Sequence, residues 1–329
     1  MKITKPFYYD QFRCIADRCP DSCCHEWEVA VDEASARRYL ALPGELGDAL
    51  RQKLKQTDAG YYLEITDSRC PMWRADGLCQ IQYELGHDAL CQTCQDFPRL
   101  RHDYGDFVEL GLELSCPEAA RLILSDREDL FVTMDAPGGS EPDYERATMA
   151  VLLSTRSRAL KILEGHDIPT ALALLLVYSA HAQADVDAGE VTDFDETAAM
   201  TMLGALSLPD PRPLTDFYAG LELLTDRWAA LLRDPHPLPH WPEEIRAMAR
   251  CQLHRYWLQA VSDWELAARV KMIVASCILV RQLGADVIST AQLYSKEIDN
   301  DADNIDAILD AAYTSAAFTD LNLLALLTQ

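Results

Sequence analysis

Residues 143–165 read DYERATMAVLLSTRSRALKILEG, and the apolar positions recur every three or four residues. This spacing places on one side of a helix the residues Met149, Leu152, Leu153, Leu160 and Leu163. Asp143 is a typical N-cap, and Gly165 suits the C-terminal end. The stretch therefore predicts an amphipathic helix.

The rest of the second half continues this pattern. Ser262 and Glu265 have the spacing of a capping box and predict a helix that runs to Gly284. Residues 304–327 can form one or two more helices. Because no strand-like alternation or fixed repeat persists, residues 144–329 are predicted to be an α-helical domain, built as a bundle.

The first half is rich in cysteine, since nine of the eleven cysteines lie at or before Cys116. Residues 135–143, DAPGGSEPD, read as a linker and divide residues 1–137, a cysteine-rich metal- or cluster-binding region, from residues 144–329. Helices are expected at 32–42 and 116–124, and strands at 61–65 and 106–114. The predicted fold class is mainly α, with few short strands in the first region.

Composition and charge argue against nucleic-acid binding and membrane insertion. The 329 residues are 49% hydrophobic and 25% charged, which is typical of a soluble globular protein. The net charge of −24 repels phosphate, so we expect no nucleic-acid partner. The first residues lack an apolar signal segment, and the longest apolar run, 171–178, is far shorter than the roughly 18 residues of a spanning helix. We therefore expect a cytoplasmic protein without membrane insertion.

In a reducing cytosol, the clustered cysteines are expected to be free or metal-bound. The candidate ligands are Cys14, Cys19, Cys23, Cys24, Cys70, Cys79, Cys91, Cys94 and Cys116. Cys91 and Cys94 form a C-x2-C pair, which lets two thiolates approach one metal. Which four bind at one site is left open by the spacing.

The choice of metal rests on the residues that follow the cysteines. Three of these cysteines precede proline, at Pro20, Pro71 and Pro117, as iron–sulfur ligands often do. This favours a [4Fe–4S] cluster, with zinc as the alternative. His25 or His87 could replace a thiolate. Cys251 and Cys277 are predicted to be buried free thiols.

Several motifs resemble the flagellin lysine-N-methylase family, within a broader group of cysteine-rich zinc- or iron-chelating proteins. They are FYYDQFRC (7–14), the C-x3-C-C run followed by HEW (19–27), G-x-C-x-I (77–81), C-x2-C-x-x-F-P-R (91–99) and SCPEAARLIL (115–124). The resemblance covers the cysteine-rich half well. In the helical half it is carried by LHRYWLQAV (253–261).

The resemblance implies an enzyme that transfers methyl groups from S-adenosylmethionine to surface lysines of flagellin, the protein of the bacterial flagellum. It also implies that a cysteine-bound [4Fe–4S] cluster takes part and that the active site lies in the first half. The sequence departs from common methyl-transfer motifs. Glu26 stands where a C-x3-C-x2-C motif would need cysteine, and no G-x-G-x-x-G occurs.

Some residues beside the cysteines are candidates for binding the methyl donor. Aromatic walls for its sulfonium could come from Tyr8, Tyr9, Trp27, Trp73 and Tyr83. Asp96, Arg99 and Glu118 lie near Cys94 or Cys116 and could orient ligands, and Arg99 could pair with a carboxylate. Arg99, Tyr83 and Glu118 are thus the candidate cofactor-binding residues. The catalytic base stays unidentified.

Two other functions fit the same sequence. One is a non-enzymatic protein that chelates or delivers zinc or iron. The other is an interaction protein whose helical half binds a partner and whose metal is structural.

Overall fold

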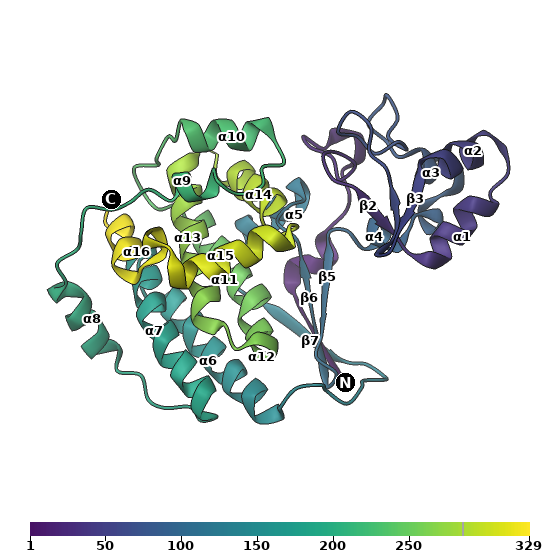
Figure 1. Cartoon of the computed structure of the whole chain (residues 1–329). Helices are drawn as coiled ribbons and strands as arrows, with labels where there is room; N and C mark the ends of the chain where they lie inside the picture. The colour runs from purple at the N-terminus through teal and green to yellow at the C-terminus, as the bar shows by residue number, and fades with distance from the viewer. Residues whose placement is uncertain (285) are drawn as a thin grey trace.

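The computed structural model describes residues 1–284 and 286–329, and it is mainly α-helical, which confirms the predicted class. A large helical body and a smaller body lie side by side, and a four-stranded sheet stands between them (Figure 1). Of the described helices, none combines the length and apolar character needed to cross a membrane.

Long helices form the centre of the large body: α6 (Arg146–Gly165), α7 (Ile168–Ala188), α11 (Glu243–Tyr256) and α13 (Leu266–Leu283). Helix α13 is apolar on nearly every side and packs against α7, α11 and α15 (Ala302–Thr314). A helix of this kind is stable only when other elements cover it all round. The remaining helices of this body are α5 (Pro117–Ser125), α8 (Glu196–Ala205), α9 (Thr215–Tyr218), α10 (Asp226–Arg233), α12 (Ala260–Asp263), α14 (Val287–Glu297) and α16 (Asp320–Leu327).

The predicted helices form, but two predicted caps are wrong. Helix α6 begins at Arg146 with Glu145 at its N-cap, so Asp143 does not cap it. Ser262 lies inside the short helix α12, and Glu265 is the N-cap of α13 without a side-chain hydrogen bond. Trp264, at φ 64°, turns the chain between α12 and α13, which separates the two residues of the supposed capping box.

The four-stranded sheet has the order β5 (Arg99–Asp103), β6 (Phe107–Leu112), β1 (Lys2–Pro6) and β7 (Phe131–Asp135). Strand β1 runs parallel to β6, with Lys2 opposite Phe107, and antiparallel to β7, with Lys2 opposite Asp135. The other pair, β5 and β6, forms an antiparallel hairpin. Of these strands, only the one within 106–114 was predicted.

The smaller body contains a three-stranded antiparallel sheet of order β2 (Val29–Val31), β4 (Gly60–Leu63) and β3 (Leu54–Thr57). Around this sheet lie α1 (Glu33–Ala41), α2 (Gly44–Lys53), α3 (Gln80–Leu85) and α4 (Gln92–Asp96). The helix predicted at 32–42 and the strand predicted at 61–65 are confirmed as α1 and β4.

The buried apolar side chains form two clusters. One lies within residues 29–91 and includes Cys70 and Cys91. The other combines Phe12 and residues 112–124 with the helices of the large body. The division proposed at residues 135–143 stays a prediction.

Candidate metal and substrate site

The loop that carries the first cysteines is fixed to a second loop by main-chain hydrogen bonds. The amide of Cys70 donates to the carbonyl of Cys24 at 2.8 Å, and the amide of Glu26 donates to the carbonyl of Ser68 at 2.7 Å. Glu26 has a φ of 81°, a left-handed conformation that reverses the chain next to the thiols. Residues 23–26 and 68–70 therefore bring Cys23, Cys24 and Cys70 together.

The C-x2-C pair is positioned by a short helix. Cys91 is the N-cap of α4, Cys94 lies within the helix, and the Cys91 thiol donates to the carbonyl of Ala30 at 3.7 Å. Asp32 accepts from the amides of both Gln92 and Ser35, each at 2.9 Å, so one carboxylate caps α4 and α1. These amide hydrogen bonds lower the pKa of Asp32 to about 2, the one from Gln92 most strongly.

Hydrogen bonds between neighbouring thiols shift the pKa values of the cysteines. A hydrogen bond from the Cys94 thiol lowers the pKa of Cys91, and the same bond raises the pKa of Cys94 above its usual range. A hydrogen bond from Cys24 lowers the pKa of Cys70, and a hydrogen bond to Cys24 raises that of Cys23. Cys24 and Cys23 also raise the pKa of Cys94, so these five thiols are near neighbours.

The other four predicted ligands border this group. Burial raises the pKa of Cys79, and the nearby Cys23 and Cys91 add to this effect. Burial likewise raises the pKa of Cys116 to about 12, with Cys19 and Cys23 nearby, and Cys14 contributes to the raised pKa of Cys19. Since Cys116 is the N-cap of α5, a helix of the large body, the cysteine set draws on both bodies.

The chemistry of this donor set suits a thiolate-bound metal centre. All eleven cysteines are free, Cys277 is buried as predicted, and Cys251 is half-buried. Zinc bound at about 2.3 Å to four sulfurs would hold them roughly 3.8 Å apart. In residues 1–284 and 286–329, the one triplet of ligand atoms within 4.8 Å of one another comes from Asp21, His25 and Glu26, and no triplet of thiols is so close.

The Asp21, His25 and Glu26 triplet already faces a cation of the protein. The Lys296 ammonium on α14 lies 2.9 Å from Asp21 and 2.8 Å from Glu26, and its side chain is 1% exposed. The same ammonium is 5.2 Å from the Trp27 ring centroid. Gln292, one turn earlier on α14, donates to Asp21 at 3.1 Å. Helix α14 therefore anchors the cysteine loop to the large body.

A cleft opens beside the thiols, between the two bodies, and has an empty volume of about 1030 Å³ including its open side. The smaller body and the segment that follows it contribute Cys23, Trp27, Glu28, Val29, Ala30, Thr93, Cys94, Asp96 and Phe97, and the large body contributes Arg99, Glu113 and Asn300. The predicted residues Cys23, Cys94, Trp27, Asp96 and Arg99 therefore meet at one cavity.

Aromatic and charged groups are fixed in this cleft. The Arg99 guanidinium lies 5.1 Å from the Phe12 ring centroid and 5.9 Å from that of Tyr9, and no carboxylate of the described residues forms a salt bridge with it. Trp27 meets Phe97 edge to face, with the ring centroids 6.1 Å apart. The wall thus offers an arginine free to bind an anion beside an aromatic surface that suits a cation.

Glu113 supplies a buried carboxylate. It is 7% exposed, and burial raises the pKa of its carboxyl, although Arg255, 3.2 Å away, opposes this effect. Glu113, Glu28 and Asn300 were not predicted. Glu113 lies three residues before Cys116 and could have been considered, whereas nothing in the sequence relates Asn300 or Lys296 to the cysteines.

The structure keeps other predicted residues away from the cleft. Tyr83 is 66% exposed and stacks under Arg74, whose guanidinium is 3.7 Å from the ring centroid. Glu118 forms hydrogen bonds of 2.8 and 2.6 Å with Arg121 on the same helix, and these lower the pKa of its carboxyl. His87 is exposed, and Trp73 packs edge to face with His25.

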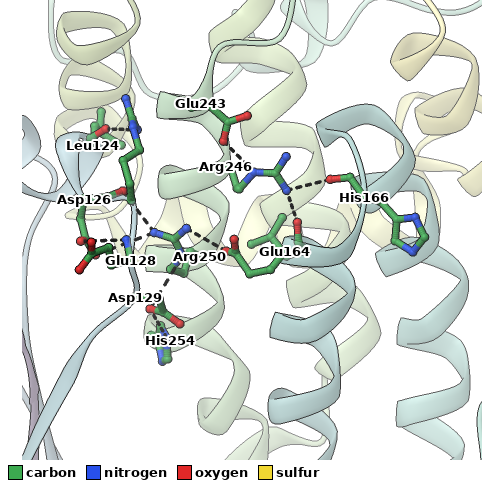
Figure 2. A network of polar contacts seen from close by, with 12 residues as sticks. Leu124, Asp126, Glu128, Asp129, Glu164, His166, Glu243, Arg246, Arg250 and His254 are labelled. Carbon is green, nitrogen blue, oxygen red and sulfur yellow. Dashed lines mark hydrogen bonds and ion pairs between the residues drawn. The ribbon is translucent and has the colours of Figure 1, made fainter.

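A second cavity of about 600 Å³ lies between the four-stranded sheet and α11, and it contains Tyr8, His102 and Cys251. Figure 2 shows the charged network beside it. Arg250 donates to Glu164 at 2.8 Å, and His254 contacts Asp129 at 3.2 Å. This network fixes α11 to α6 and to the segment that precedes β7, and it is separate from the thiols.

Comparison with known proteins gives three partial matches. The chain is 29% identical over 167 residues to the Flagellar biosynthetic protein FliU of Salmonella muenchen, covering 49% of this chain and 95% of that protein. It is 33% identical over 138 residues to the Lysine-N-methylases of Salmonella typhimurium (strain LT2) and Salmonella choleraesuis (strain SC-B67), covering 40% of this chain and 34% of each relative.

The chain thus spans about a third of the length of the two methylases it matches. No family model matches it, and the comparison with solved structures gave no match. The similarity to lysine-N-methylases that the motifs indicated is confirmed.

Proposed function

We propose that this chain is a cytoplasmic protein-lysine N-methyltransferase that uses S-adenosylmethionine and acts on flagellin. The similarity to a flagellar biosynthetic protein and to two lysine-N-methylases supports the general activity. The observation that carries the proposal is that Cys23 and Cys94 line the same cleft as Trp27, Asp96 and Arg99.

The cleft offers the groups that the methyl donor requires. We assign Arg99 to the donor's carboxylate, because its guanidinium is held against aromatic rings and has no acidic partner among the described residues. Trp27 and Phe97 would contact the sulfonium. Asp96 and Glu28, both exposed on the cleft wall, would accept hydrogen bonds from the donor's amino and hydroxyl groups.

Methyl transfer needs a neutral lysine, whose pKa in water is about 10.4. The ammonium first loses a proton, for which we assign the buried Glu113 as acceptor because it lines the cleft and its pKa is raised. The nitrogen lone pair then attacks the methyl carbon, the carbon–sulfur bond breaks, and its electron pair goes to sulfur. The products are methyl-lysine, S-adenosylhomocysteine and one proton.

We further propose that the thiols hold a [4Fe–4S] cluster, with zinc as the alternative. Four of the nine predicted cysteines would supply its ligands, drawn from Cys23, Cys24, Cys70, Cys91 and Cys94, with Cys91 and Cys94 as the C-x2-C pair, and from the bordering Cys14, Cys19, Cys79 and Cys116. When bound, such a cluster would supply an electron-transfer centre and connect the loops that carry its ligands.

The test uses protein purified without oxygen. We expect stoichiometric iron and sulfide, binding of S-adenosylmethionine by calorimetry, and methylated lysines on purified flagellin by mass spectrometry. Protein that contains neither iron nor zinc would contradict the metal centre. Metal-loaded protein that does not bind S-adenosylmethionine and leaves flagellin unmodified would contradict the enzyme.

A metal-delivery function is the second candidate, and one observation favours it. Cys14 and Cys23 are exposed, so a metal held there would be accessible to an acceptor protein. In this case, the loaded protein should pass its metal to a competing thiol peptide within minutes. Retention of the metal under the same conditions would favour the enzyme.

A further inference from the structure

Strand β5 has one edge that no described strand covers. In the sheet order β5-β6-β1-β7, β5 lies at one end, and in residues 1–284 and 286–329 it pairs with β6 alone. Arg101 and Asp103 are exposed, and they pair with each other at 2.8 Å. The strand contains none of the prolines that commonly protect a free edge.

The register identifies the main-chain groups that face outward. The main-chain amide of Glu113 donates to the carbonyl of Pro98 at 2.8 Å, and the main-chain amide of Tyr104 donates to the carbonyl of Phe107 at 2.9 Å. The residues that flank β5 at each end therefore form hydrogen-bonded pairs with the β6 strand. In an antiparallel ladder, hydrogen-bonded pairs alternate with non-hydrogen-bonded pairs, and in the latter the main-chain amides and carbonyls point away from the partner strand. The amides and carbonyls of Arg99, Arg101 and Asp103 therefore point to the uncovered edge.

This edge leads into the cleft. Arg99 is both the first residue of β5 and part of the cleft wall. The cleft wall that includes Arg99 also contains Glu28, Asp96 and Glu113, three carboxylates that favour a cationic side chain. The edge of β7 that no strand of the described residues covers is separated from β5 by β6 and β1, and β7 contributes no residue to the cleft.

We propose that the protein substrate docks as an added strand on the outer edge of β5, with its lysine entering the cleft at Arg99. The occupant is an extended segment with a single cationic side chain at the cleft. Main-chain hydrogen bonds would give affinity regardless of neighbouring side chains, and the Glu113 carboxylate, assigned above as the acceptor of the lysine proton, would select lysine. This inference rests on the proposed function and specifies how its substrate binds.

Hydrogen exchange of the wild-type protein tests the docking without depending on turnover. Unmodified flagellin monomer is added, and amide exchange is measured by mass spectrometry with fragmentation to single residues. We expect slower exchange at Arg101 and Asp103. Thr133 and Asp135, which face outward on β7 by the same register argument, should be unchanged. Unchanged β5 amides, or protection on β7 instead, would overturn the inference.

Variants test the same edge through kinetics. Arg101→Pro removes an outward amide, Arg101→Ala keeps it, and Thr133→Pro is the matched change on β7. We expect Arg101→Pro to raise KM for flagellin about tenfold with kcat unchanged, and the other two variants to resemble wild type. N-acetyl-lysine amide, too short to pair as a strand, should be methylated equally by all four proteins.

The outcomes separate the two proposals. If Arg101→Pro and Arg101→Ala have the same KM for flagellin, the docking model is wrong while the methyltransferase stands. If flagellin slows exchange at β5 but wild type methylates neither substrate, the methyltransferase is wrong while the docking stands. Should Arg101→Pro fail to fold, the exchange experiment on wild type decides.

Discussion

At the scale of single residues, Arg99 is the predicted cofactor-binding residue that the structure places in the cleft. The other two predicted cofactor-binding residues lie outside the cleft. Tyr83 stacks with Arg74, and Glu118 accepts a hydrogen bond from Arg121. All three residues lie near a cysteine in the sequence. Closeness in sequence therefore did not determine which side chains face the cavity.

Replacement of Arg99 separates these roles. Arg99→Gln removes a charge that can pair with a carboxylate, so we expect affinity for S-adenosylmethionine to fall about tenfold or more. Tyr83→Phe is the control and should leave the affinity unchanged. Calorimetry with the metal-loaded proteins measures both. Equal affinity of Arg99→Gln and wild type would exclude Arg99 from donor binding.

His102 illustrates a pH effect on stability. Burial lowers the pKa of His102 below its ordinary value, and Arg255 adds to the effect. The unfolded chain therefore binds a proton at higher pH than the folded chain does. The contribution of neutral His102 to the unfolding free energy is complete above pH about 6.5, the pKa of an unfolded histidine. As the pH falls from there toward the lowered pKa of the folded state, the unfolding free energy decreases by at most about 1.4 kcal/mol per pH unit.

His102→Gln should reduce this dependence. The difference in unfolding free energy between pH 7.5 and 5.5, measured with urea, is expected to be smaller in the variant than in wild type. Identical pH profiles for the two proteins would show that His102 does not contribute.

At the scale of elements, short helices and loops around the thiols are positioned by single polar contacts. Asp32 caps α1 and α4 together, so Asp32→Ala removes two caps and should lower the unfolding free energy by about 1–3 kcal/mol. Asp167→Ala, which removes one cap at α7, should cost about half as much. Urea unfolding of both variants tests this, and equal losses would show that the second cap contributes nothing.

Lys296 connects α14 to the cysteine loop. Lys296→Met leaves Asp21 and Glu26 without their buried partner, so we expect a loss of about 3 kcal/mol and reduced metal content. Lys271→Met, at a pair whose acidic partner is 59% exposed, should cost less than about 1 kcal/mol. Urea unfolding and metal analysis measure both effects. Full metal content in Lys296→Met would show that the loop is held without α14.

At the scale of the whole molecule, the thiol-rich region is the place where two bodies meet. Cys116 belongs to the large body, and Cys70 and Cys91 belong to the core of the smaller one. A metal centre bound there would cross-link loops that belong to the two bodies.

Removal of the metal should therefore loosen these loops first. With chelator and oxidant, we expect faster trypsin cleavage after Arg13, Arg18 and Arg69, while the segment of α6 and α7 stays resistant. Mass spectrometry of the fragments identifies the sites. Cys277→Ser, which changes a buried thiol in α13, should keep the metal and the wild-type pattern. Identical cleavage with and without metal would contradict a structural role for the centre.

The sequence by itself determined the helical half and the chemical identity of the thiol set. Three-to-four spacing of apolar residues is a local property, so α6, α13 and the last helices could be predicted within a few residues of their ends. The clustering of nine cysteines and the quoted motifs likewise depend on sequence alone.

Only the tertiary structure decided that β1 pairs with β6 and β7. It also decided that Glu113 and Asn300 line the same cleft as Cys23 and Cys94, and that Lys296 forms an ion pair with Asp21. These contacts join residues up to 275 positions apart. Periodicity and capping rules act over about four residues, so they carry no information on such partners. The cleft therefore depends on how the two bodies pack, which no short segment encodes.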